Sequence, residues 1–117
     1  MSSLFGISVE ETETFTKAIK KLQKRFKNIE TDCDTFIQSI QTTQDLGINL
    51  GQGVYKVRIA NSDKKSGKSS GYRLISYLKL VDNRLYLMYI YDKSDFDTVS
   101  ENTIDELIKK TILEKKS

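Results

Sequence analysis

The sequence contains no histidine, no proline and no tryptophan, and it has a single cysteine, Cys33. The absence of histidine excludes catalytic triads that use imidazole, and together with the lone cysteine it excludes ordinary zinc sites. One cysteine cannot form an internal disulfide, so the sequence does not indicate an oxidising compartment. No apolar run approaches the roughly 18 residues that span a bilayer, and no signal-peptide pattern opens the chain. We therefore expect a cytoplasmic protein without a membrane segment, a metal or a cofactor.

The length and the charge pattern narrow the class further. The 117 residues suit one domain, and we expect a single domain over residues 1–117. With 19 basic and 16 acidic residues the net charge is only +3, but residues 17–27 and 54–73 are strongly basic. Residues 28–53 and 92–106 are net acidic. Basic blocks attract polyanions, although a basic run is also typical of the solvated face of a helix.

The spacing of apolar residues changes along the chain. Helical spacing runs through residues 12–29, 33–40 and 104–112, whereas residues 54–60, 72–81 and 84–91 read as strands. Residues 7–11 are either the start of the first helix or a short edge strand, and residues 47–53 and 61–71 are predicted loops. The order predicts an α+β fold with two N-terminal helices, an antiparallel meander of three to four strands and a C-terminal helix. The candidate helix N-caps are Thr12 or Thr14, Thr31 or Asp32, and Thr98 or Ser100.

A two-residue turn at Asp82-Asn83 aligns the last two strands and sorts the side chains of the meander onto two faces. The apolar face, expected to pack against helices, holds Val57, Ile59, Leu74, Leu78, Met88 and Ile90. The other face holds Lys56, Arg58, Arg73, Tyr77, Lys79, Tyr89 and Tyr91, with Lys93 just beyond.

Basic side chains bind phosphate and tyrosine rings stack on splayed bases, so this second face is typical of single-stranded RNA binding. Strand tyrosines and outward-facing lysines also occur on surfaces that bind nothing. Leu85 and Leu87 fall on the same face in this register. We therefore expect part of it to be covered, with the C-terminal helix as the candidate cover.

The loop between the first two strands of the meander adds further candidates for RNA binding. Its sequence contains the string GKS, but the full phosphate-binding motif is absent and the flanking strands are antiparallel, so a nucleotide hydrolase is not indicated. The candidate RNA-binding residues from this loop and the sheet are Lys64, Lys65, Lys68, Ser69, Tyr72, Tyr77, Lys79 and Tyr89.

Three runs in combination, VYKVRIA at 54–60, SGKSSGYRLI at 66–75 and YIYDKS at 89–94, resemble the RelE/HigB group of bacterial toxins. The resemblance covers about residues 8–113 and implies a small α+β fold with a curved antiparallel sheet. It also implies the toxin of a type II toxin–antitoxin module, an mRNA endonuclease that cuts in the ribosomal decoding site. A cognate antitoxin, often a helix-turn-helix protein of the HigA type, would neutralise it. The alternatives are a ParE-like poison of DNA gyrase, or a non-catalytic relative that only binds its antitoxin.

The resemblance also implies roles for individual residues. Lys56 and Arg58 occupy the basic positions of the family on the strand before the loop, and Arg73 matches the arginine thought to hold the scissile phosphate. Lys93 occupies the basic position at the end of the last strand. The chain departs from the pattern of members that use histidine, and from members with a tyrosine after the last strand, where this chain has Phe96.

RNA cleavage by its own 2′-hydroxyl needs proton removal, stabilisation of a dianionic phosphorane and protonation of the 5′-oxygen. Preorganised cations supply the second requirement, so we assign Arg73 and Arg58 as phosphorane clamps. A lysine among other cations loses its proton more readily, which makes Lys56 a candidate base or a further clamp. Tyr91 or Lys93 would be the proton donor or an orienting group. This chemistry needs no metal.

Overall fold

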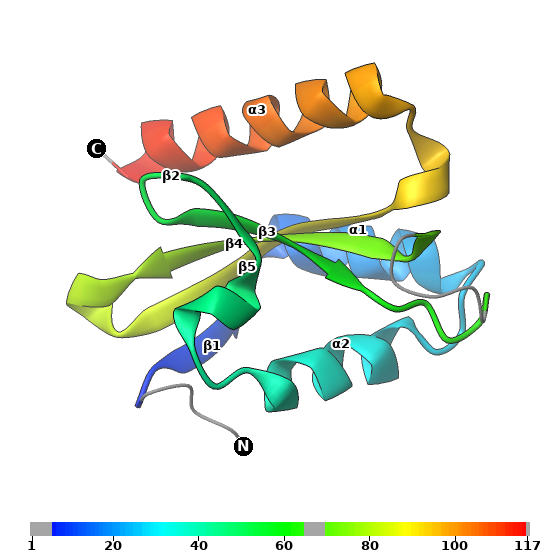
Figure 1. The fold of residues 1–117 in the computed structure, drawn as a ribbon, viewed down its shortest axis with the longest axis horizontal. Coiled ribbons are helices and arrows are strands. Elements are labelled where there is room, and N and C mark those ends of the chain that lie inside the picture. The colour runs from blue at the N-terminus through cyan, green and yellow to red at the C-terminus, as the bar shows by residue number, and fades with distance from the viewer. Residues whose placement is uncertain (1–5, 65–69, 117) are drawn as a thin grey trace.

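A central sheet lies between two helical layers, with two helices on one face and one helix on the other (Figure 1). The computed structural model describes residues 6–64 and 70–116. The elements in chain order are β1 Ser8–Glu11, α1 Glu13–Gln23, α2 Ile29–Ser39, a 3₁₀ turn Thr43–Leu46, β2 Ile48–Gly51, β3 Val54–Ile59, β4 Tyr72–Lys79, a 3₁₀ turn Leu80–Asp82, β5 Arg84–Asp92, a 3₁₀ turn Lys93–Asp95 and α3 Thr98–Lys116. The predicted α+β class and the order of its helices and strands are confirmed.

The sheet has five strands in the order β1-β5-β4-β3-β2. The predicted meander is its centre, β3, β4 and β5, and all of its pairs are antiparallel. The edge strand at β1 is confirmed, and it pairs parallel to β5. The prediction of a loop over 47–53 is wrong in part, because Ile48–Gly51 forms β2 and pairs with β3. Gly51, Gln52 and Gly53 all have positive φ and make the tight reversal between these strands.

The observed ends of the helices differ from those predicted from the spacing of apolar residues. The first stripe is split, because α1 ends at Gln23 and Ile29 already belongs to α2. Thr12 caps α1 as predicted, since its hydroxyl accepts a hydrogen bond from the Phe15 amide at 3.2 Å. The caps predicted for the other two helices are wrong: α2 has no side-chain cap, and the Asp97 carboxylate accepts from the Ser100 amide at 2.7 Å.

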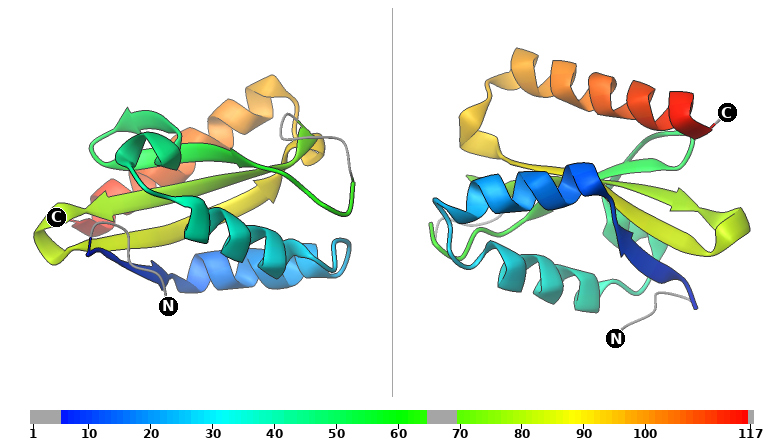
Figure 2. Two further views of the ribbon diagram at one scale, coloured as in Figure 1. Left: turned by 60° about the horizontal axis from the view of Figure 1, so that its bottom comes forward. Right: turned by 180° about the vertical axis from the view of Figure 1, so that it is seen from behind.

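The helices α1 and α2 lie on one side of the sheet (Figure 2). The face of the sheet toward them carries the main apolar core. A β-bulge in β5 opposite Ile75 and Ser76 makes Met88 an extra residue in its strand. The bulge reverses the alternation of side chains on its N-terminal side, so Leu85 and Leu87 join the main core and Met88 faces α3. The sequence-based assignment of these three side chains is therefore wrong, because a one-residue shift moves a side chain to the other face.

The opposite face of the sheet packs against α3, which is the cover predicted for part of this face. Ile112 is buried there, and Ile104 and Ile108 are partly buried, in a cluster with sheet residues that include Val54 and Ile75. None of the described helices is long and apolar enough to cross a membrane.

Candidate active site

A row of basic side chains crosses the sheet on the face toward α3. Arg58 of β3 lies directly opposite Arg73 of β4, which in turn lies opposite Tyr91 of β5. Like charges directly opposite one another destabilise a sheet, so two paired arginines need negative charge nearby. The pairing of the two arginines therefore favours the presence of a negatively charged group at this point of the sheet.

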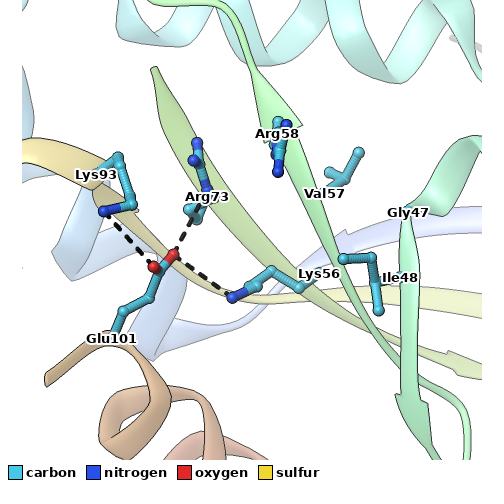
Figure 3. Close-up of a pocket in the computed structure, with 8 residues that line it drawn as sticks. All are labelled: Gly47, Ile48, Lys56, Val57, Arg58, Arg73, Lys93 and Glu101. Atoms are coloured by element: carbon cyan, nitrogen blue, oxygen red, sulfur yellow. Dashed lines mark hydrogen bonds and ion pairs between the residues drawn. The ribbon is translucent and has the colours of Figure 1, made fainter. Parts of the chain in front are cut away.

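A cleft of about 410 Å³ opens beside this row. The predicted groups Lys56, Arg58, Arg73 and Lys93 all line it, and Figure 3 shows Lys56, Arg73 and Lys93 around one carboxylate. The structure therefore brings together the basic candidates of β3, β4 and the end of β5. Apart from these four cations, the lining residues are Gly47, Ile48, Val57 and Glu101.

The carboxylate in this cleft is that of Glu101, in the first half of α3. Its Oε2 lies 3.5 Å from Nε of Arg73 and 3.5 Å from Nζ of Lys56, and its Oε1 lies 3.7 Å from Nζ of Lys93. The hydroxyl of Tyr91 donates to Oε2 at 2.9 Å. Four of the five predicted catalytic residues therefore contact one carboxylate.

Asp105, one turn further along α3, completes the network. Its Oδ2 lies 2.5 Å from Nζ of Lys56, and its Oδ1 lies 3.0 Å from the Tyr91 hydroxyl. Glu101 and Asp105 are 6% and 4% exposed, so both acids are buried against the sheet. Arg58, by contrast, is exposed and makes no ion pair with any residue that the structure describes.

The environment shifts the protonation of two groups in this network. Burial alone would raise the pKa of the Glu101 carboxyl, but the Tyr91 hydrogen bond and the charges of Lys56 and Lys93 outweigh it and lower that pKa. Burial, the charge of Asp105 and the bonds to both carboxylates raise the pKa of the Tyr91 phenol well above its ordinary value. Glu101 therefore stays ionised at neutral pH, and Tyr91 stays protonated.

Lys56 shares the cleft with three other cations, but its amine contacts two carboxylates. The ion-pair partners of Lys56 are Glu101 and Asp105. The amine therefore meets negative as well as positive charge in this arrangement.

The predicted base-stacking tyrosines are not an open platform. Tyr77 is buried and Tyr89 half-buried on the α3 side of the sheet. Tyr72 is fully buried on the other side, edge-on to Phe26 with ring centroids 5.8 Å apart. The sequence-based placement of Tyr72 among surface RNA-binding residues is wrong, since its position in β4 sends the ring into the main core. Burial raises the pKa of its phenol.

The remaining RNA-binding candidates lie away from the cleft or outside the described residues. Lys64 holds the fully buried Asp92 carboxylate at 2.7 Å and also contacts the Ser94 hydroxyl at 3.0 Å. This lysine therefore ties the base of the loop to the end of β5. Lys79 lies at the other end of β4 and pairs with Asp82 at 3.0 Å. Lys65, Lys68 and Ser69 lie outside the described residues.

Comparisons with known proteins identify the family and the fold. The profile of the family described as "RelE toxin of RelE / RelB toxin-antitoxin system" matches residues 12–115. The chain belongs to the RelE toxin family. Among solved structures it is similar to the isolated E. coli RelE toxin, with a TM-score of 0.51 and 14% identity over 86% of this chain and 98% of that one. At this identity the structural match shows the fold alone. No curated protein matches the sequence.

Membership in the RelE toxin family makes the chain a toxin of a toxin–antitoxin system. Glu101, which lines the cleft of this RelE-family toxin, and Asp105, which pairs with Lys56 beside it, were not predicted from the sequence. A signal for them was present, because residues 101, 105, 108 and 112 share one helical face with the predicted apolar stripe. Two acids in line with buried isoleucines indicate carboxylates directed at the sheet rather than at water.

Proposed function

We propose that this toxin is an endoribonuclease that cleaves mRNA on the ribosome and thereby inhibits translation. The observation that carries the proposal is the convergence of Lys56, Arg73, Lys93 and Tyr91 on one carboxylate. A site that holds a carboxylate with three cations and a hydroxyl has the donors that a phosphate diester also needs. Membership in the RelE family supports the same conclusion.

The steps of RNA cleavage give roles to the groups of the site. The 2′-oxygen attacks the adjacent phosphorus, the bond to the 5′-oxygen breaks, and the products carry a cyclic phosphate and a 5′-hydroxyl. Arg73 and Arg58 stabilise the negative charge that develops on the phosphorane. Lys56 takes the proton of the 2′-hydroxyl or acts as a third clamp. Tyr91 or Lys93 gives a proton to the leaving oxygen, and the raised pKa of Tyr91 keeps its phenol protonated in this structure, as a donor requires.

Dependence on the ribosome follows from the absence of histidine. Without an imidazole base, much of the rate must come from holding the 2′-oxygen in line with the scissile bond. The decoding site can supply that alignment for mRNA, whereas naked RNA in solution remains flexible. The protein should therefore act in the cytoplasm, where translating ribosomes are found.

Two experiments test the activity. Induced expression in bacteria, followed by mapping of transcript 5′-ends, should show cuts inside translated frames. Purified protein should cut mRNA on translating ribosomes and degrade the same naked RNA poorly. Intact transcripts together with DNA damage would instead indicate a gyrase poison of the ParE type, and efficient cleavage of naked RNA would contradict ribosome dependence.

We further propose that a cognate antitoxin, of the helix-turn-helix HigA type, neutralises the toxin. The basic side chains of residues 17–27, most of them exposed on and after α1, would attract an acidic segment of such a partner. Co-expression of the small reading frame next to the toxin gene should restore growth. Failure of every flanking frame to do so would contradict a two-gene module.

A further inference from the structure

Basic side chains in the cleft of this toxin already contact a negatively charged group of the same chain, the carboxylate of Glu101. Lys56, Arg73 and Lys93 contact the Glu101 carboxylate (Figure 3). The Tyr91 hydroxyl donates a hydrogen bond to the same carboxylate. A carboxylate presents two oxygens that accept from these donors much as the two non-bridging oxygens of a phosphate diester would. In this structure Glu101 therefore stands where the proposed function requires the scissile phosphate.

Asp105 adds a second negative charge beside the first. It pairs with Lys56 at 2.5 Å and is 4% exposed. A phosphate that entered beside both acids would meet two like charges in a poorly solvated space, which opposes its binding. RNA can use Lys56 and Arg73 only if the acids of α3 leave them.

The attachment of α3 permits that exchange. Of its described apolar side chains, only Ile112 near the C-terminal end is buried; Ile104 and Ile108 are partly buried, and Val99 and Leu107 are 76% and 56% exposed. The first half of the helix is thus held to the sheet by the ion pairs and hydrogen bonds of Glu101 and Asp105, and its one apolar contact in the cluster on this face is the partly buried Ile104. Ion pairs can be replaced by a phosphate of like charge with little change in the charge balance of the cleft, whereas a packed apolar contact cannot.

We propose that Glu101 and Asp105 are specificity-determining residues: they occupy the phosphate subsite and must be displaced, with the first half of α3, before RNA binds. This inference rests on the proposed function. If the open state is a small fraction of the free protein, the apparent affinity for RNA falls by that fraction. A ribosome presents mRNA at a high effective concentration and so offsets the loss, whereas dilute naked RNA does not. The acids would therefore restrict the toxin to ribosome-bound mRNA.

The first test measures binding without chemistry. A short single-stranded RNA with 2′-O-methyl groups has no attacking hydroxyl, so its affinity reports the phosphate subsite alone. Glu101→Gln keeps the shape of the side chain and removes its charge, and we expect binding about tenfold tighter or more than wild type. Glu106→Gln, on the exposed side of the same helix, changes the net charge equally and should leave the affinity within about twofold.

The outcomes separate the inference from its alternatives. Equal tightening in both variants would reduce the effect to net charge, and unchanged or weaker binding by Glu101→Gln would overturn the inference. Loss of ribosomal cleavage by Glu101→Gln with unchanged oligonucleotide affinity would make Glu101 a catalytic base and also overturn it. Tighter binding in a protein that cuts no mRNA on ribosomes would support the occupied subsite while contradicting the proposed nuclease.

A second test uses the wild-type protein and so does not depend on the folding of a variant. Saturation with the same oligonucleotide should speed amide hydrogen exchange in the first half of α3, while β4 stays protected. Slower exchange in α3 on binding would mean that RNA binds with the helix in place, and the inference would fail.

Discussion

The two faces of the sheet are covered by helices that contact it through different kinds of interaction. Toward α1 and α2 the contact is apolar, with Phe15 and Ile29 among its fully buried side chains. Toward the first half of α3 the contact is a network of ion pairs around Glu101 and Asp105, together with the partly buried Ile104. An apolar contact is lost only at the cost of exposing it to water, whereas a charge contact can be exchanged for another anion. The difference assigns stability to one face and binding to the other.

Two neighbouring residues of β4, Leu74 and Arg73, point to opposite faces of the sheet. Substituting one or the other therefore disrupts the contacts of one face at a time. Leu74 is 1% exposed in the main core. Leu74→Ala should lower the free energy of unfolding by about 2 to 5 kcal/mol through loss of apolar contact and formation of a cavity. Urea unfolding measures the effect, and protein that remains folded should still cut mRNA on ribosomes.

Arg73→Ala removes a cation from the other face of the sheet, the one toward α3. Loss of one preorganised donor to the developing charge should lower the rate of ribosomal cleavage by about 10² to 10³-fold. The unfolding free energy should change by no more than about 1 kcal/mol, because three other groups still hold Glu101 and the opposition to Arg58 is relieved. Arg73→Lys should restore little activity, since lysine lacks the planar fork of arginine. A folded and fully active Arg73→Ala variant would refute the assignment.

Lys64 tests whether the base of the loop belongs to the structure or to RNA binding. Lys64→Met should lower the unfolding free energy by about 2 kcal/mol or more, because the buried Asp92 carboxylate loses its only ion-pair partner among the described residues. Affinity for the methylated oligonucleotide should fall little by comparison. Thermal unfolding and oligonucleotide binding on the same samples decide the matter, and the reverse pattern would return Lys64 to the RNA-binding set.

Acidification should have the smallest effect on the free energy of unfolding, and it tests the contribution of the ion pairs of α3. Because the pKa of Glu101 is lowered in the folded state from its ordinary value of 4.5, the ionised carboxylate stabilises the fold above that pH. This contribution is lost as the pH falls below 4.5 through the lower folded value. The difference in unfolding free energy between wild type and Glu101→Gln should therefore shrink toward low pH. A difference that grows on acidification would contradict the sign.

The sequence predicted the fold where one physical rule acts locally. Alternation over residues 54–60 and 72–81 located β3 and β4, and helical spacing located α1, α2 and α3. The glycines at 51 and 53 concealed β2, because residues with positive φ indicate a turn but do not reveal which strand precedes it. The turn between β4 and β5 is also longer than predicted, with Leu80–Asp82 in a 3₁₀ turn and Asn83 at a φ of 53°.

For the candidate site, the basic residues were recognisable and their surroundings were not. Residue type and alternation were enough to predict that Lys56, Arg58 and Arg73 share a face, because a strand sends alternate side chains the same way. The bulge at Met88 was not predictable from the sequence of β5, because no residue type marks it. It is defined only by how β5 pairs with β4.

The sequence by itself determined the class of protein, the cations and the face on which they lie, because these depend on residue type and on the period of the strands. Only the tertiary structure decided what those cations meet. Glu101 and Asp105 lie 45 and 49 positions along the chain from Lys56, and it is the packing of α3 across the sheet that brings them into contact. Contacts between segments so far apart depend on how whole elements pack, and no local pattern records them.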